Sequence, residues 1–96
     1  MIGVILELSI KEGRRENFIE MMKSILPETR AFDGCQKFDV WTDNSDAAHV
    51  VLNEIWDSVE QHQAYLGWRV ENGTLNQLVA FLNEPPAPKY FEILDA

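Results

Sequence analysis

The sequence predicts an α+β fold in which helices cover one face of an antiparallel sheet. Three patterns indicate this class: alternation of residue types at the N-terminus, a turn cluster between two further strands, and helical stretches that separate the strands along the chain. At 96 residues the chain has the length of a single domain, which we expect to span residues 1–96. A domain of this size buries a modest core and often gains stability by self-association.

The N-terminal third predicts a strand followed by a helix. Apolar side chains fall on alternate positions from Ile2 to Ile10, as a half-buried strand requires. After a turn at residues 11–13, apolar residues recur at helical spacing as far as Leu26. Pro27 either ends this helix or kinks it, and in the second case the helix continues to about Phe32.

The middle of the chain predicts a hairpin and a second helix. Cys35–Thr42 and Ala47–Trp56 have strand patterns, and the turn cluster at residues 43–46 between them indicates a hairpin. Ser58 and Gln61 then stand at capping-box spacing, which predicts the start of a helix.

The C-terminal part predicts a short helix and a last strand. Residues 72–73, Asn-Gly, offer a left-handed stop, and Thr74 and Gln77 repeat the capping spacing before a third helix. Prolines within residues 85–88 form a linker that no helix can cross, and residues 89–94 have strand composition. The resulting order is the split β-α-β pattern of a ferredoxin-like sandwich (βαββαβ) with an antiparallel sheet.

The second face of this sheet has a mixed composition. If the strand alternation holds, that face carries Glu7, Ser9, Lys37, Asp39 and Trp41. The set is too mixed for a dry core and too aromatic for a face exposed to water. We therefore expect a homodimer in which two copies pair these faces around a partly polar space.

The run from Asn53 to Gly73 concentrates the reactive side chains around one predicted helix. At 100° per residue, the apolar line of this helix comprises Val59, Leu66 and Val70. His62, Tyr65 and Arg69 form a stripe beside that line and can meet one another. Trp68 falls on the opposite side, so the proline-rich tail, a second chain or a ligand must cover it.

Each of these candidates has a functional and a structural interpretation. Trp56 either closes the core at the end of its strand or lays its indole against a flat substrate. His62 is either a locally hydrogen-bonded buried histidine or a general base. Tyr65 and Arg69 either orient a phenolate or carboxylate ligand or form a surface pair and a dimer contact.

Two polar residues on the predicted strands are further candidates. Glu7, on the second face of the sheet, is either a desolvated base or one half of an interface salt bridge with Lys37. Asn53 lies within an apolar stretch and must find hydrogen bonds if it is buried, so it holds either a ligand or a backbone group.

Composition and missing motifs exclude several classes of function. Eight basic against sixteen acidic residues give a net charge of −8, so we expect no nucleic-acid partner. The lone Cys35 allows no internal disulfide and leaves no zinc-ligand set, which suits a cytoplasmic location. We expect no signal peptide and no membrane segment. No nucleotide-binding or metal-binding motif occurs, so an enzyme on this scaffold would act without a cofactor or a metal.

These segments together resemble the antibiotic biosynthesis monooxygenase (ABM) family. The residues that carry the resemblance are VILELSIKEG of the first strand, Phe18, Gly34–Phe38, Glu54-Ile55-Trp56 and Tyr90-Phe91-Glu92. The resemblance spans nearly the whole chain and implies a dimeric α+β barrel with a pocket between sheet and helices in each protomer. Some members oxidise electron-rich polyphenols or quinols with molecular oxygen and no prosthetic group. Others degrade haem or isomerise small signalling molecules.

The chain departs from the commoner pattern of that family in its second helix. That pattern has a histidine nine residues after the tryptophan of Glu-x-Trp, where this chain has Tyr65, with His62 one helical turn earlier. The arrangement resembles that of a distinct subgroup, so the base assigned in other members does not carry over. The haem-degrading branch is disfavoured, because its strand-one asparagine is absent from VILELSI and its later histidine falls near Leu75.

Two functions follow as hypotheses. In the first, the chain is a cofactor-independent monooxygenase acting on a small phenolic or quinol-type metabolite. Trp56 would shape the pocket, His62 or Tyr65 would help to deprotonate the substrate, and Arg69 would hold the anion. In the second, the chain is a non-catalytic dimeric module that binds a small aromatic ligand or serves in the response to stress or in detoxification. A cavity that reaches His62 and Arg69 would suit both hypotheses, whereas side chains pointing into solvent would oppose both.

Overall fold

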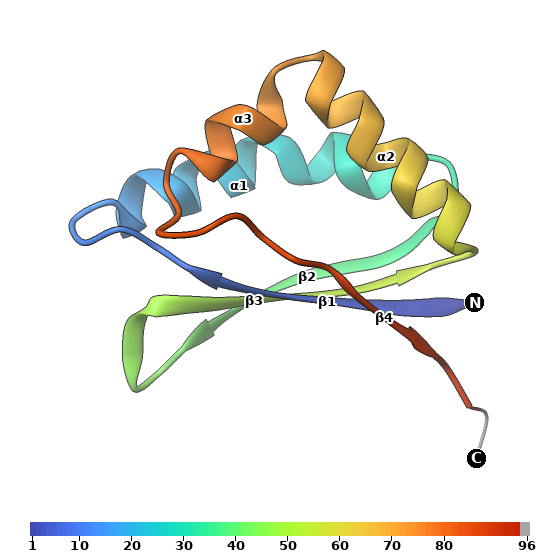
Figure 1. The fold of residues 1–96 in the computed structure, drawn as a ribbon, viewed down its shortest axis with the longest axis horizontal. Coiled ribbons are helices and arrows are strands. Elements are labelled where there is room, and N and C mark those ends of the chain that lie inside the picture. Colours follow the sequence, from blue (N-terminus) through green and yellow to red (C-terminus); the bar gives the residue numbers. More distant parts are fainter. Residues whose placement is uncertain (95–96) are drawn as a thin grey trace.

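A computed structural model of the chain describes residues 1–94 and has the predicted α+β architecture. Its elements are β1 (Ile2–Ser9), α1 (Arg15–Ala31), β2 (Cys35–Asp43), β3 (Asp46–Trp56), α2 (Val59–Glu71), α3 (Thr74–Val79) and β4 (Lys89–Glu92). The strands form one antiparallel sheet in the order β2-β3-β1-β4, and the helices lie together on one side of it (Figure 1). This confirms the ferredoxin-like sandwich.

Alternation along the two central strands separates the faces of the sheet. Val4 and Leu6 of β1 pair with Glu54 and Leu52 of β3, and all four side chains are buried beneath the helices. The intervening residues point to the other side, as period-two strand geometry requires. Glu54 therefore lies in the middle of the core layer, at 2% exposure, where the other three residues are aliphatic.

Helix α1 runs through Pro27 and ends at Ala31, which is the second of the two predicted alternatives. Pro27 lies on the exposed side of the helix, where water can bond the carbonyl group that loses its partner. The buried side carries Phe18, Met22, Ile25 and Thr29 at helical spacing. Gly34 then takes a φ of 93° in the predicted turn into β2.

The buried side of α2 differs from the predicted one. His62, Tyr65 and Arg69 are its buried residues, whereas Val70 is 53% exposed, so the prediction of an apolar line ending at Val70 is wrong. Polar side chains occupy the interior here because hydrogen-bond partners on other elements compensate their desolvation. The predicted capping box is confirmed: the side chain of Ser58 accepts a hydrogen bond from the backbone N–H of α2 residue 61 at 3.2 Å.

The segment after α2 follows the predicted order with changed details. Gly73, at a φ of 82°, is the N-cap of α3 and makes no side-chain cap, so the second predicted capping box is wrong. Asn72 supplies the local hydrogen bond instead, accepting from the Thr74 N–H at 3.0 Å. The last strand ends at Glu92, two residues before the predicted end. Within residues 1–94, no helix is long and apolar enough to cross a membrane.

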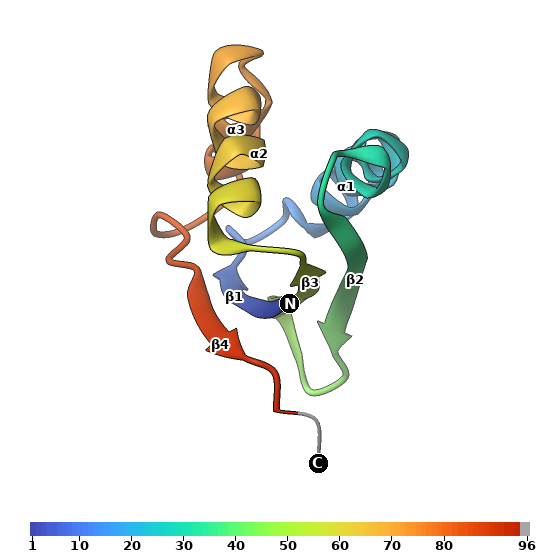
Figure 2. The ribbon, with the colours of Figure 1, turned by 90° about the vertical axis from the view of Figure 1, so that its right-hand side faces the viewer.

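Among residues 1–94, no helix covers the second face of the sheet (Figure 1 and Figure 2). Figure 2, viewed from the side, shows α1 and α2 above the sheet, while the ends of β2 and β4 curve below its central strands. The alternation and register place the predicted residues on this open face: Glu7, Ser9, Lys37, Asp39 and Trp41. Trp41 is 53% exposed, and Phe91, which pairs with Gly3 on the same face, is 50% exposed.

Candidate functional site

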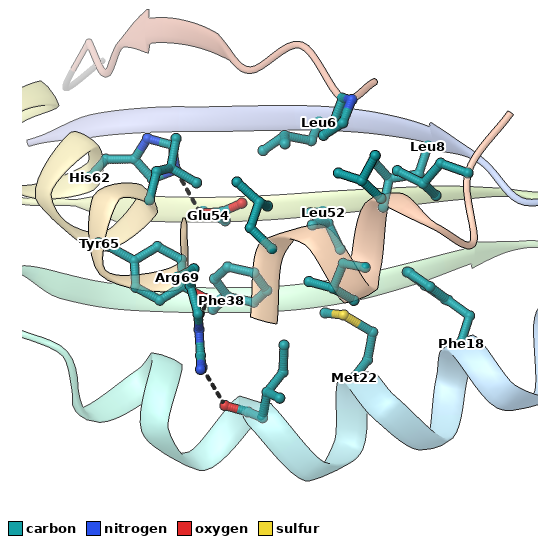
Figure 3. A pocket seen from close by; sticks show the side chains of 17 residues that line it. Leu6, Leu8, Phe18, Met22, Phe38, Leu52, Glu54, His62, Tyr65 and Arg69 are labelled. Atoms are coloured by element: carbon teal, nitrogen blue, oxygen red, sulfur yellow. Dashed lines mark hydrogen bonds and ion pairs between the residues drawn. The ribbon is translucent and has the colours of Figure 1, made fainter. Parts of the chain in front are cut away.

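A mainly apolar cavity lies between the sheet and the helices (Figure 3). Its volume is about 50 Å³. Apolar side chains from the sheet, from α1 and from the α2–α3 region line most of it, and the polar residues on its wall are Glu54, His62, Tyr65 and Arg69. Sites for organic ligands occupy roughly 300–1,000 Å³, so a ring-sized ligand requires the wall to move. Helix α3 has no buried residue yet contributes Leu75 and Leu78 to the wall, so it is the helix of the wall with the least burial to hold it in place.

The Glu54 carboxylate is held at the cavity wall by two neighbours. The indole Nε1–H of Trp56 donates to Glu54 Oε1 at 2.8 Å, and His62 Nε2 lies 3.5 Å from the same oxygen. His62 is 1% exposed and Trp56 is fully buried. Figure 3 shows the imidazole and the carboxylate facing each other across the cavity wall. The structure thus provides the carboxylate partner of His62 that the sequence could not assign.

The other nitrogen of His62 leads toward the surface. Nδ1 lies 2.9 Å from the hydroxyl oxygen of Tyr90. Tyr90 pairs with Val4 and so lies on the helix side of the sheet, yet it is 37% exposed because β4 is an edge strand. Burial, and secondly the charge of Glu54, raises the pKa of the Tyr90 hydroxyl. That hydroxyl therefore remains protonated at neutral pH.

Arg69 and Tyr65 bind to α1. The Arg69 guanidinium donates to Thr29 Oγ1 at 2.9 Å, to the Ile25 carbonyl at 3.2 Å and to the Tyr65 hydroxyl at 3.1 Å. The Tyr65 and Thr29 hydroxyls lie 2.7 Å apart. Burial, as the largest cause, raises the pKa of Tyr65, so this phenol keeps its proton at neutral pH. Arg69 therefore links α2 to α1 through hydrogen bonds and also lines the cavity.

The structure brings together four of the predicted site residues. Trp56, His62, Tyr65 and Arg69 all lie beneath or along α2, with Trp56 packed against the rings of His62 and Tyr65 at centroid distances of 5.3 and 5.1 Å. His62 and Arg69 both line the cavity, and neither points into solvent. For Trp56 the structure shows the core position at the strand end.

Trp68 lies beside this group, outside the cavity wall. Its ring packs against Phe32 at 5.4 Å and beneath the Arg69 guanidinium at 4.3 Å. The expectation that the proline-rich tail, a second chain or a ligand must cover this indole is therefore wrong. The reason is that Phe32, the C-cap residue of α1, reaches across to α2.

Glu7 and Asn53 lie on the open face, on the opposite side of the sheet from the cavity. Within the chain, Glu7 pairs with His49 at 3.2 Å and Lys37 pairs with Asp39 at 3.4 Å, so a Glu7–Lys37 salt bridge across an interface stays a prediction. Asn53 stands between Ile5 and Asp39 in the strand register and is half-buried. Neither residue can contact a ligand in the cavity.

Sequence reasoning missed Glu54, Thr29 and Tyr90 as site residues. For Glu54 a signal was present, because it occupies a core position in the alternation of β3 between Leu52 and Trp56. Thr29 and Tyr90 become relevant only through contacts with residues far along the chain, at sequence separations of 36 and 28. Within residues 1–94, no group of three or more His, Cys, Asp or Glu side chains could hold a metal ion.

The fold and this site define a small ferredoxin-like protein with an interior cavity that presents a carboxylate–imidazole pair. The chain belongs to the antibiotic biosynthesis monooxygenase family, whose model matches residues 1–68. A comparison of the sequence with curated proteins gives no match.

Solved structures share the fold at low sequence identity. A crystal structure of an antibiotic biosynthesis monooxygenase has a TM-score of 0.87 and 17% identity, covering 99% of this chain and 100% of that one. Rv0793 from Mycobacterium tuberculosis has a TM-score of 0.84 and 22% identity, covering 99% and 96%. A conserved protein from Methanosarcina mazei Go1 has a TM-score of 0.83 and 17% identity, covering 94% and 89%. At such identities the likeness establishes the fold and leaves the chemistry to the site.

Proposed function

We propose that the chain is a cofactor-independent monooxygenase that acts on a small phenolic or quinol-type metabolite in the cytoplasm. Membership of the antibiotic biosynthesis monooxygenase family supports a monooxygenase-like role. The observation that carries the proposal is the pairing of Glu54 with His62 at the wall of an apolar cavity. Such a pair can remove a proton from a bound quinol, and the electron-rich anion that results can reduce oxygen directly.

Each cavity residue then has a role in the reaction. His62, next to Glu54, helps to deprotonate the substrate. Arg69 lines the cavity and supplies the positive charge that favours the substrate anion. Tyr65 keeps its proton and holds Arg69 in place, and Trp56 backs the wall. The substrate provides all the electrons: one oxygen atom enters the product, and the other leaves as water.

We further propose that the active form is a homodimer that pairs the open faces of two sheets. Trp41 and Phe91 support this proposal because each exposes about half of an aromatic side chain on that face, at 53% and 50%. Burial of such a surface stabilises association by about 25 cal/mol for each Å² of apolar area removed from water.

A second candidate function is a non-catalytic module that binds a small aromatic ligand. The observation that favours it is the bonding of Arg69, whose N–H groups already donate to Thr29, Tyr65 and the Ile25 carbonyl. A guanidinium engaged in this way is a weaker anion clamp. This function predicts that an aromatic ligand raises the melting temperature without turnover, because binding only the folded state raises apparent stability.

The proposed function is tested by oxygen uptake of purified, metal-free protein with a panel of hydroquinones and anthrones. We expect uptake by the wild type and a reduction of about 100-fold or more in His62→Ala, since a general base contributes roughly 10²–10⁴. Glu60→Gln is the control, because Glu60 lies on the same helix as His62 and is exposed. Uptake no greater than that of the double variant His62→Ala, Tyr65→Phe would refute the monooxygenase.

A further inference from the structure

The geometry points to a proton relay in which Glu54 takes the proton of the bound acid and His62 and Tyr90 connect Glu54 to solvent. This inference rests on the proposed function and names the residue that receives the proton. It also assigns a role to β4, which contributes Tyr90. His62 lies between the other two side chains: its Nε2 faces Glu54 Oε1, and its Nδ1 faces the Tyr90 hydroxyl.

Glu54 is placed to receive the proton. Its side chain is 2% exposed and lines the cavity. Within residues 1–94, the polar contacts of this carboxylate, from Trp56 at 2.8 Å and His62 at 3.5 Å, go to Oε1. The second oxygen is thus available for a ligand. A purely structural role explains the position less well, because an aliphatic residue would fill this core layer without desolvating a charge.

His62 joins the carboxylate to the edge of the sheet. Its Nε2 faces Glu54 and its Nδ1 faces the Tyr90 hydroxyl at 2.9 Å, so both ring nitrogens are committed to one path. The rings of Trp56 and Tyr90 pack on the imidazole at centroid distances of 5.3 and 5.4 Å and fix its orientation. An imidazole can accept a proton on one nitrogen and release one from the other.

Tyr90 is the outer end of the path. It is 37% exposed on an edge strand, so its hydroxyl can exchange a proton with water while the Glu54 carboxylate cannot. Its raised pKa, due to burial and then to the charge of Glu54, keeps the hydroxyl protonated at neutral pH. A protonated hydroxyl can accept one hydrogen bond and donate another, as a relay requires.

The transfer balances with protons alone. Glu54 takes a proton from the bound acid and becomes a neutral carboxyl group. In the tautomer with its proton on Nδ1, His62 accepts the Glu54 proton on Nε2 and passes the Nδ1 proton to the Tyr90 oxygen. The original Tyr90 proton moves to water, and Glu54 is a carboxylate again. The reverse sequence returns a proton to the cavity.

Two measurements test the relay, and neither involves oxygen. The first is the ¹⁵N NMR spectrum of His62 without ligand: Tyr90→Phe should shift the Nδ1 resonance through loss of its hydrogen bond. The second is exchange of the slow C–H proton of nitroethane, a small carbon acid, in D₂O under anaerobic conditions. Wild type should accelerate this exchange, Glu54→Gln should abolish the acceleration, and Tyr90→Phe should slow it about tenfold.

Control variants separate the relay from a structural effect. Added imidazole buffer should restore exchange in Tyr90→Phe, because it can carry protons in place of the hydroxyl. Glu92→Gln, on the same strand and on the same side of the sheet as Tyr90, should exchange at the wild-type rate, because Glu92 is exposed. Tyr90 is partly exposed, so Tyr90→Phe is expected to fold.

Several results would overturn the relay. They are an unchanged Nδ1 resonance, wild-type exchange no faster than that of Glu54→Gln, an unaltered rate in Tyr90→Phe, or a slow rate that buffer fails to restore. A protein that exchanges protons but consumes no oxygen would retain the relay and lose the proposed function. Oxygen uptake by the wild type, together with a normal exchange rate in Tyr90→Phe, would retain the proposed function and refute the relay.

Discussion

Arg69 shows, at the scale of a residue, how a charged side chain becomes part of a core. Its exposure is 2%, and its planar group reaches a hydroxyl of α1, a carbonyl of α1 and a hydroxyl of α2 at the same time. A lysine has one compact ammonium group and could not cover this spread of acceptors. The Trp68 ring covers one face of the guanidinium at 4.3 Å.

Loss of Arg69 should therefore destabilise the fold. We expect Arg69→Leu to lower the free energy of unfolding by about 2–3 kcal/mol, because buried acceptors lose a charged donor. The free energy of unfolding of Arg69→Lys should lie between those of Arg69→Leu and the wild type. Urea titration measures both changes. Neutral surface substitutions change the free energy of unfolding by up to about 0.5 kcal/mol. A change this small for Arg69→Leu would show that the hydrogen bonds of Arg69 to α1 do not stabilise the fold.

His49 should make stability depend on pH. Its ring nitrogens lie 2.8 Å from Asp43 and 3.2 Å from Glu7. The hydrogen bond to Asp43, followed by that to Glu7, raises the pKa of His49 above its ordinary 6.5. Because the folded pKa exceeds the unfolded one, the contribution is complete below about pH 6.5 and is lost as the pH rises through the folded pKa.

The comparison of wild type with His49→Gln measures this effect. The difference in urea midpoint should be largest near about pH 6 and should shrink as the pH rises toward about 9. The hydrogen bond to His49 lowers the pKa of Asp43, so Asp43 remains a carboxylate throughout this range. Parallel pH profiles for the two proteins would contradict the ion-pair account.

At the scale of elements, the turn before β2 requires a glycine, whereas the middle of α2 can accept a larger residue in place of one. Gly34 has a φ of 93°, and a Cβ there would lie 2.6 Å from Cδ and 2.8 Å from Cβ of Gln61. Gly67 is exposed in α2, with nothing within 4 Å of an added Cβ. The same substitution should therefore have opposite effects at the two positions.

We expect Gly34→Ala to destabilise the fold by about 2 kcal/mol through backbone strain and the clash with Gln61. Gly67→Ala should stabilise it by about 0.5–1 kcal/mol, the difference in helix propensity. Thermal and urea unfolding report both signs. Shifts in the same direction would show that the backbone conformation at Gly34 does not decide the outcome.

The order and type of the elements followed from local patterns, whereas the inner side of α2 did not. Strand alternation and the Ser58 cap depend only on residues close together in the chain, so both can be predicted from a single sequence. Counting apolar residues placed Val70 inside because it could not include Thr29, the partner of Arg69 and Tyr65 on another helix. A polar stripe becomes a core surface only when its distant partners are known.

At the scale of the molecule, the site and the open face lie on opposite sides of one sheet. The cavity with Glu54 and His62 is on the helix side, and Glu7 and Asn53 are on the other. The predicted site thus divides into a cavity group and an open-face group. Sequence spacing shows which residues alternate along a strand, but it does not show that a ligand can touch only one set.

The proposed homodimer predicts a selective effect of charge on the open face. Trp41→Glu should convert a dimer at micromolar concentration into a monomer, since it places a carboxylate in an apolar contact. Val70→Glu is the matched control, because both side chains are 53% exposed and Val70 lies on α2. Sedimentation velocity distinguishes the two. A folded wild-type monomer at that concentration would contradict the assembly.

The proposed function requires that the cavity beneath α2, and not the open face, binds an aromatic acid. The most direct measurement is a crystal structure of the protein with hydroquinone bound. We expect the ring between sheet and helices, α3 displaced to admit it, and one hydroxyl within hydrogen-bond distance of Glu54. A ring seated against Trp41 on the open face, with the cavity unchanged, would show that the cavity is not the ligand site.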